Sequence, residues 1–224
     1  MIFIKILFIA IICFMVSTNV SGATISEIIN ISGYSYYEGD KLNAGQHYPI
    51  KVGGIIAVRG ETSYAEGLFQ NIVFRVVGGK VSIEKSLMKK KDKAGNDRKT
   101  QKVGMRLIEG KIFLHMTKSF GESDLQLKMP RCNLFIRGVE AKPTTAVYAF
   151  ASKEKVAVYA HKGALTIIMP GSKKKKVRLT EGNFWEYDGS ASNETKKLDD
   201  ERKLKKLLET FEQLAQISLE KLGE

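Results

Sequence analysis

Short apolar runs alternate with polar or glycine-containing breaks along most of the chain, and the runs are densest between residues 107 and 168. Stretches of four to seven residues there, such as 125–129, 146–151 and 156–160, are rich in β-branched, aromatic and other apolar side chains. Consecutive β-strands have this pattern. No helical period of comparable length lies between them, so the pattern predicts an all-β domain and argues against a parallel sheet with crossover helices.

Turn signals recur at about the 8–12-residue spacing that is typical of a sandwich, a barrel or a rolled sheet. Two alternating runs flank Gly78 and Gly79, and we expect a tight β-hairpin there because glycine adopts the positive φ that two-residue turns require. Other turns are expected at Glu109-Gly110, Phe120-Gly121, Pro130, residues 152–155, Lys162-Gly163, Pro170-Gly171 and Glu181-Gly182. The predicted fold is a set of rolled antiparallel sheets, either jelly-roll-like or a short solenoid-like sandwich.

The character of the chain changes after residue 193, where apolar residues fall at helical spacing with Lys and Glu between them. This spacing predicts an amphipathic α-helix over residues 194–222. Two interpretations stay open for its apolar face. The helix packs across the β domain or lies partly free in solvent, or it binds a partner or a second copy of itself. The residues of that face are Leu204, Leu207, Leu208, Phe211 and Leu214.

The N-terminal segment has the features of a secretory signal peptide. Residues 2–16 are apolar except for Lys5, and small and polar residues follow as far as Ala23. The apolar run is shorter than the roughly 20 residues of a spanning helix, so we expect cleavage near Gly22 or Ala23. If it stays uncleaved, this segment is the expected membrane contact. The chain then divides into a signal peptide (1–23), a β domain (24–189) and a helix (190–224), and we expect an exported protein, periplasmic or secreted.

The chain is basic, with 36 Lys and Arg against 24 Asp and Glu and a formal net charge of +12. Two tracts are candidate contacts for an anionic partner: Lys89, Lys90, Lys91, Arg98, Lys99, Lys173, Lys174 and Lys175. The first tract lies in residues 88–102, which lack apolar periodicity and which we expect to form a long exposed hairpin loop or a locally disordered excursion. Nucleic acid is not expected as the partner, because neither tract has the interleaved aromatic residues of single-strand readers. The alternative is that these lysines are simply solvated.

No residue pattern indicates catalysis or a cofactor. After removal of the signal segment Cys132 is the one cysteine, and it begins an apolar run, which favours a buried thiol. The histidines His47, His115 and His161 have no metal-ligand spacing with each other or with a cysteine. Glycine motifs that bind phosphate are also absent from the sequence. We therefore predict a protein that is not an enzyme and that holds neither a metal nor a cofactor.

The β region, over roughly residues 28–187, resembles the FecR domain of bacterial iron-signalling regulators. The ordered elements that carry the resemblance are Leu-Ile-Glu-Gly at 107–110, Leu-Gln-Leu-Lys-Met-Pro at 125–130, Leu-Phe-Ile-Arg-Gly at 134–138, Val-Ala-Val-Tyr-Ala at 156–160 with Gly163, and Leu-Thr-Glu-Gly at 179–182. The chain departs from the family at Met129 and Val139, where threonine is usual. The resemblance implies an exported bacterial all-β domain without catalytic residues.

Full-length regulators of this type carry a cytoplasmic anti-sigma segment and a membrane helix ahead of the domain. The apolar run begins at residue 2 of the sequence, so we expect no cytoplasmic segment ahead of the domain and do not carry the anti-sigma role over.

These features favour a non-enzymatic binding or scaffold module at the bacterial cell envelope. Its expected partner is an envelope protein or an anionic envelope polymer. A second hypothesis is signal relay, in which the domain binds an envelope receptor and passes its state on through the helix. An envelope hydrolase ranks last, because the sequence has no recognisable nucleophile–base pair. The oligomeric state stays open.

Overall fold

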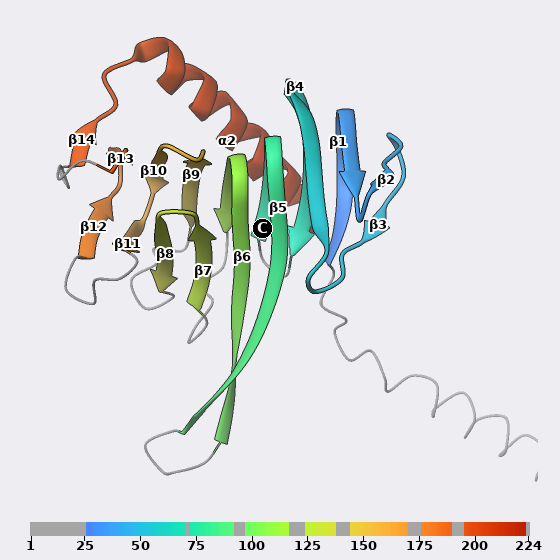
Figure 1. Ribbon diagram of the computed structural model, residues 1–224, viewed down its shortest axis with the longest axis horizontal. Coiled ribbons are helices and arrows are strands. Elements are labelled where there is room, and N and C mark those ends of the chain that lie inside the picture. Colours follow the sequence, from blue (N-terminus) through green and yellow to red (C-terminus); the bar gives the residue numbers. More distant parts are fainter. Residues whose placement is uncertain are drawn as a thin grey trace, which may run out of the picture.

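The computed structural model describes residues 26–69, 72–91, 97–116, 124–137, 144–169, 176–189 and 195–222. Strands make up most of this chain, and one helix follows them (Figure 1). The prediction of rolled antiparallel sheets with a C-terminal helix is confirmed, and the sheet does not close into a barrel. Within the described ranges, no helix has the length and apolar character needed to cross a membrane.

Long antiparallel strands form the first half of the fold. Their order in the sheet is β1-β4-β5-β6, and the short strands β2 and β3 pair with the outer edge of β1. The bounds are β1 (Ser26–Tyr37), β2 (Asp40–Lys41), β3 (Tyr48–Pro49), β4 (Ile55–Phe69), β5 (Ile72–Lys91) and β6 (Asp97–Met116).

Strand β6 is where the sheet forks into two arms. Residues 110–116 pair antiparallel with β9, whereas residues 103–106 pair in parallel with β7. The first arm has the order β9-β10-β13-β14 and the second has the order β7-β8-β11-β12. The bounds are β7 (Asp124–Met129), β8 (Cys132–Arg137), β9 (Thr145–Ala151), β10 (Val156–Lys162), β11 (Ala164–Ile168), β12 (Lys176–Thr180), β13 (Asn183–Tyr187) and β14 (Thr195–Lys197).

The inner faces of both arms share one hydrophobic core. Alternate residues of every arm strand except β14 point into it, as the period of a strand requires. Trp185 from the first arm and Leu134, Ile167 and Leu179 from the second are almost fully buried in the same cluster. The fold is therefore a sandwich whose two layers are continuous with each other through the long strands.

A line of glycines bends the long strands where the two halves of the sheet meet. Gly33, Gly60, Gly78 and Gly110 lie one on each of β1, β4, β5 and β6, and all have positive φ. Register shifts mark the same places in the strand pairs. We call this line the glycine crease. A side chain on Gly110 would overlap the backbone of Gly78 and of Gly79 on the neighbouring strand.

The hairpin expected at Gly78 and Gly79 is wrong, and so is the turn expected at Glu109-Gly110. Strand β5 runs through the first pair and β6 runs through the second, and pairing resumes at once with Lys80 opposite Glu109. Gly78 and Gly110 adopt positive φ, whereas Gly79 does not. These glycines lie at β-bulges that bend continuous strands. A local sequence pattern does not distinguish a bulge from a turn, because both require the same backbone freedom.

The turns predicted later in the chain are confirmed where the structure describes them. Pro130 and Arg131 connect β7 to β8, residues 152–155 connect β9 to β10, and Glu181-Gly182 connects β12 to β13. Gly163 separates β10 from β11. The turns expected at residues 120–121 and 170–171 lie outside the described residues.

Helix α2 (Glu201–Leu222) begins seven residues later than predicted, because Thr195–Lys197 forms strand β14. Asp200 caps the helix: its Oδ1 accepts a hydrogen bond from the N–H of Lys203 at 2.9 Å, and its carbonyl accepts the N–H of Leu204 at 2.8 Å. The helix lies across the outer face of the long strands and the first arm (Figure 1), opposite the sandwich core. The molecule thus has three layers.

We predict that Gly110→Ala lowers the free energy of unfolding by at least about 2 kcal/mol, because it adds both backbone strain and overlap with β5. Gly45→Ala is the matched control. Gly45 also has positive φ but has no atom within 4 Å of an added Cβ. Its expected loss is about 1 kcal/mol, from the strain alone. Urea unfolding measures both, and equal losses would contradict the packing of the glycine crease.

Candidate functional site

Strands β5 and β6 extend beyond the sandwich as a two-stranded ribbon (Figure 1). Their pairing continues from Lys85 opposite Val103 to Lys91 opposite Asp97. We call residues 85–91 and 97–103 the basic ribbon. Residues 88–91 and 97–102 are therefore paired strands of one long hairpin, and neither a hairpin loop nor a disordered excursion as expected. The connection between them lies outside the described residues. Apolar alternation arises when one face of a strand is buried, and a ribbon that projects from the body provides no such signal.

The register of the basic ribbon places like charges opposite each other. Lys89 pairs with Lys99 and Lys90 pairs with Arg98, whereas Lys91 lies opposite Asp97. Like charges directly across a strand pair are destabilising. The structure thus brings together five of the eight residues predicted as contacts for an anionic partner. The other three, Lys173, Lys174 and Lys175, lie outside the described residues.

The predicted apolar face of α2 packs on the β domain, which is one of the two interpretations that the sequence left open. Leu207, Phe211 and Leu214 are buried against the sheet, and Leu204 and Leu208 are half-buried. The ring of Phe211 is central to this contact. It meets Phe113 of β6 edge to face at 5.6 Å between centroids and stacks on His161 of β10 at 4.8 Å. Binding of a partner through the same face stays a prediction.

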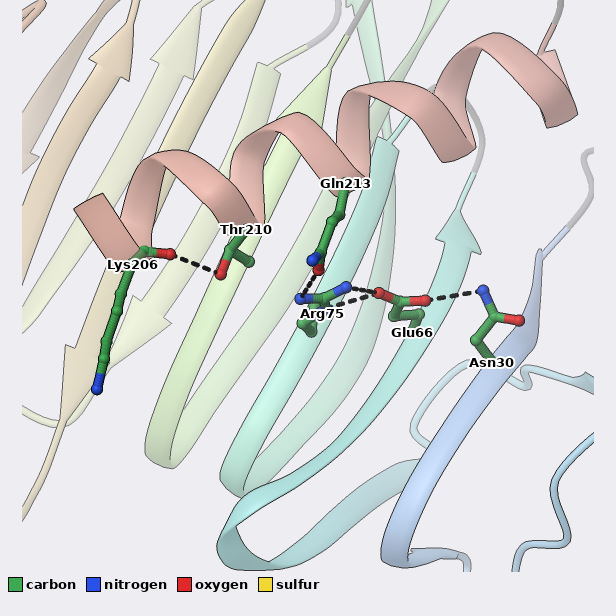
Figure 2. Close-up of polar contacts among 6 residues, drawn as sticks. All are labelled: Asn30, Glu66, Arg75, Lys206, Thr210 and Gln213. Carbon is green, nitrogen blue, oxygen red and sulfur yellow. Dashed lines mark hydrogen bonds and ion pairs between the residues drawn. The ribbon is translucent and has the colours of Figure 1, made fainter. Parts of the chain in front are cut away.

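A buried polar cluster joins α2 to the long strands (Figure 2). Arg75 of β5 forms an ion pair with Glu66 of β4, and its Nε donates to Glu66 Oε1 at 2.6 Å. Asn30 of β1 donates to the other carboxylate oxygen at 2.8 Å. On the helix side, Arg75 Nη1 donates to the side-chain oxygen of Gln213 at 2.8 Å. The guanidinium also lies over the ring of Tyr64, 4.6 Å from its centroid.

This cluster positions the helix and has no sign of catalysis. Glu66 is 2% exposed and Arg75 is 9% exposed, so each charge depends on the other for compensation. Both carboxylate oxygens are used, and the arginine makes contacts on two sides. Sequence reasoning missed the cluster because its members are far apart in the chain. The available signal was a charged residue inside an apolar strand, at Arg75 and again at Glu66.

The most reactive side chains noted in the sequence include those of Cys132, His115 and His161, and none of these belongs to a metal-binding group among the described residues. The described residues contain no group of three or more His, Cys, Asp or Glu that could hold a metal ion. Cys132 is buried in the sandwich core, and burial raises the pKa of its thiol to about 12, which disfavours the reactive thiolate. His161 stacks on Phe211, and its pKa is lowered, mainly by burial and then by Lys162.

His115 is a neutral histidine in the sheet beneath the helix layer. It is 5% exposed, and its Nδ1 has no hydrogen-bond partner among the described residues. Burial, with smaller contributions from Lys162 and His161, lowers the pKa of His115 to about 4. A buried imidazole of this kind makes the fold sensitive to acid.

Comparisons with known proteins give structural neighbours alone. No family model matches the sequence, and no curated protein matches it. Two crystal structures of a proposed anti-sigma factor from Parabacteroides distasonis are similar to this chain. Each has a TM-score of 0.46 and 16% sequence identity, over 69% of this chain. The chain spans 64% and 63% of the length of those two chains, less than two thirds.

We predict that removing one member of the Glu66–Arg75 pair costs more than removing both. Glu66→Leu alone leaves the arginine buried without compensation and should lower the free energy of unfolding by about 3 to 5 kcal/mol. The double variant Glu66→Leu/Arg75→Met should recover at least about 1 kcal/mol of that loss. Urea unfolding of the single and double variants measures the coupling.

The exposed pair Lys155–Glu186, 3.1 Å apart, is the control for this cycle. Its coupling should be below about 1 kcal/mol because both side chains are solvated. A buried pair that coupled no more strongly than this surface pair would contradict the structural role of the cluster.

We also predict a loss of stability in mild acid that depends on His115. The pKa of His115 is depressed in the folded protein, so between about pH 6.5 and pH 4 the unfolded chain binds a proton that the folded protein does not. Stability therefore falls as the pH is lowered through this window and levels off below it. The contribution at pH 4.5 is about 2 to 3 kcal/mol.

Urea unfolding at pH 7.5 and pH 4.5 checks this expectation. His115→Leu should lose about 2 kcal/mol less than the parent protein between these values. His47→Gln, at an exposed histidine, should keep the full loss. The same pH dependence in the parent protein and in His115→Leu would contradict the assignment.

Proposed function

We propose that this protein is a non-enzymatic binding module of the bacterial cell envelope, with a FecR-like β domain, and that it binds an anionic envelope polymer through the basic ribbon. The observation that carries the proposal is the cross-strand pairing of Lys89 with Lys99 and of Lys90 with Arg98. The secretory features of the N-terminal segment support a location outside the cytoplasm, periplasmic or secreted.

Charge gives the ribbon its affinity for a polyanion. The two ribbon segments hold seven Lys or Arg and one Asp, a formal excess of six positive charges. Such charges repel each other across the strand pair, and a bound anion would relieve the repulsion. Binding of this kind weakens as salt rises, because salt screens exposed charges beyond a Debye length of about 10 Å at 0.1 M.

Shape and composition favour a linear polymer as the occupant. Each ribbon segment has seven residues and extends about 23 Å at 3.3 Å per residue. An extended chain of anionic groups can follow a ribbon of this length. The ribbon contains no aromatic residue on which nucleic-acid bases would stack, which argues against single-stranded nucleic acid.

Signal relay is the second candidate, and the contact between Arg75 and Gln213 favours it. Strand β5 contains Arg75 as well as one side of the ribbon, so a displacement of β5 would act directly on α2. A relay role requires a receptor or sigma-factor gene beside this one. A gene neighbourhood without either would contradict it.

The proposal is tested by comparing the polymer binding of two variants, one with four basic residues of the ribbon neutralised and one with the same charge change elsewhere. The ribbon variant is Lys89→Gln/Lys90→Gln/Arg98→Gln/Lys99→Gln. The control removes three lysines and one arginine that are exposed on β14 and α2: Lys196→Gln/Lys197→Gln/Arg202→Gln/Lys205→Gln. Calorimetric titration with polygalacturonate at low salt should show at least a tenfold loss for the ribbon variant, because each basic residue near an anionic surface contributes about 1 kcal/mol.

The control variant should bind within about twofold of the parent protein, and the ribbon variant should show a shallower dependence of log affinity on log salt. Equal losses in both variants would mean that net charge alone drives binding, and the ribbon would be excluded as the site. Tighter binding to phosphatidylglycerol vesicles than to polygalacturonate would replace the polymer by a lipid surface.

A further inference from the structure

The surface is hollowed along the glycine crease, on the same strands as the basic ribbon. Two adjoining hollows of about 530 Å³ and 480 Å³ share Val58, Gly79 and Glu109 in their walls. The larger one is also lined by Tyr36, Arg59 and Lys80, from β1, β4 and β5. Gly60, Gly78 and Gly110 of the glycine crease line the smaller hollow, so the hollows lie where the long strands bend.

Arg59 is the cation of the larger hollow that has no carboxylate partner among the described residues. Its guanidinium stacks over the ring of Tyr36, 4.9 Å from the centroid. The acidic residues of the same wall are already engaged: Glu109 pairs with Lys80 at 3.2 Å, and Glu38 accepts the backbone N–H of Ile55 at 2.5 Å. Stacking holds the planar guanidinium in place and leaves its N–H edge for a carboxylate, which it can bind with two hydrogen bonds.

The same hollow offers apolar surface beside the cation. Ile55 is 41% exposed, and Ala57 is half-buried two residues further along β4. Alternation along a strand places both side chains on the face that also carries Arg59. A sugar ring has an apolar C–H face as well as polar groups, so a ring that carries a carboxylate matches this combination of residues.

The hollow and the basic ribbon lie on the same two strands. Lys80, in the wall of the hollow, is five residues before Lys85 on β5, a distance of about 17 Å along the strand. The acid between them is Glu84, and it is paired with both Arg106 at 2.8 Å and Lys128 at 2.6 Å. The surface between ribbon and hollow therefore stays basic, and a polymer bound along the ribbon can reach the hollow.

We infer that the hollow beside Arg59 is a subsite for one carboxylate-bearing sugar unit of the bound polymer. The carboxylate binds the Arg59 guanidinium, and the ring packs on Ile55 and Ala57. The inference rests on the proposed function, because it names the chemistry of the unit that the polymer would place there. The ribbon supplies affinity for any polyanion, and the hollow selects an acidic sugar.

The test uses digalacturonate, which is too short to occupy the hollow and the ribbon together. Binding is followed by chemical-shift changes on titration. Arg59→Gln should weaken binding at least tenfold, and Arg59→Lys should weaken it by less, because it keeps the charge and loses the planar fork. Arg178→Gln, at an exposed arginine of edge strand β12, is the matched control and should stay within twofold of the parent protein. The ribbon variant should also stay within twofold.

The outcomes separate this inference from the proposed function. In one outcome polygalacturonate binds through the ribbon, but digalacturonate binds Arg59→Gln with the same affinity as the parent protein. This outcome would overturn the subsite and leave the proposed function standing. The opposite result is that digalacturonate binding depends on Arg59 while polygalacturonate binds the ribbon variant as tightly as the parent protein. That result would support the subsite and overturn the ribbon as the binding site. Equal binding of maltose, which lacks a carboxylate, would overturn the recognition of an acidic sugar.

Discussion

The close approach of two backbone segments, at Gly78 on β5 and Gly110 on β6, underlies the architecture of this protein. A side chain at Gly110 would overlap the neighbouring strand, so the strands can bend together here because neither carries one. The bend allows β6 to pair with β9 in its last residues and with β7 further back. Both layers of the sandwich, the projecting ribbon and the hollow at Arg59 follow from this change of direction.

The layer formed by α2 depends on a different type of interaction. Aromatic packing around Phe211 provides apolar contact between the helix and the sheet. The hydrogen bonds of the Glu66–Arg75 pair and Gln213 fix the position of the helix on the sheet. Buried ion pairs contribute less to stability than to specificity in some proteins, because desolvation offsets much of their attraction. A helix held by apolar contact alone has several nearly equivalent positions on a sheet. The arginine favours the position in which Gln213 meets it.

The sequence is informative wherever a strand has one buried face. The strands from β7 to β13 and their turns at Pro130 and Gly182 follow from alternation and from turn residues. Local patterns are less informative at Gly78, where a bulge and a hairpin require the same φ, and in the basic ribbon, where no core imposes alternation. The helix start is also displaced from residue 194, since Asp200 provides the cap. The lysines of the ribbon could be identified from their charge in the sequence. Which of them lie opposite each other on β5 and β6 depends on the strand register, which the sequence pattern does not give.

The two arms of the sandwich are not successive in the chain. After β6 the chain adds β7 and β8 to the second arm and β9 and β10 to the first. It then returns to the second arm for β11 and β12 before β13 and β14 complete the first arm. Contacts of this kind join residues distant in sequence, and chains dominated by them fold slowly. Because a chain is synthesised from its N-terminus, neither arm can be completed until β12 and β13 have been made. Because the chain alternates between the two arms, the sandwich can complete its folding only late and as a unit. Incomplete chains expose unpaired strand edges until then.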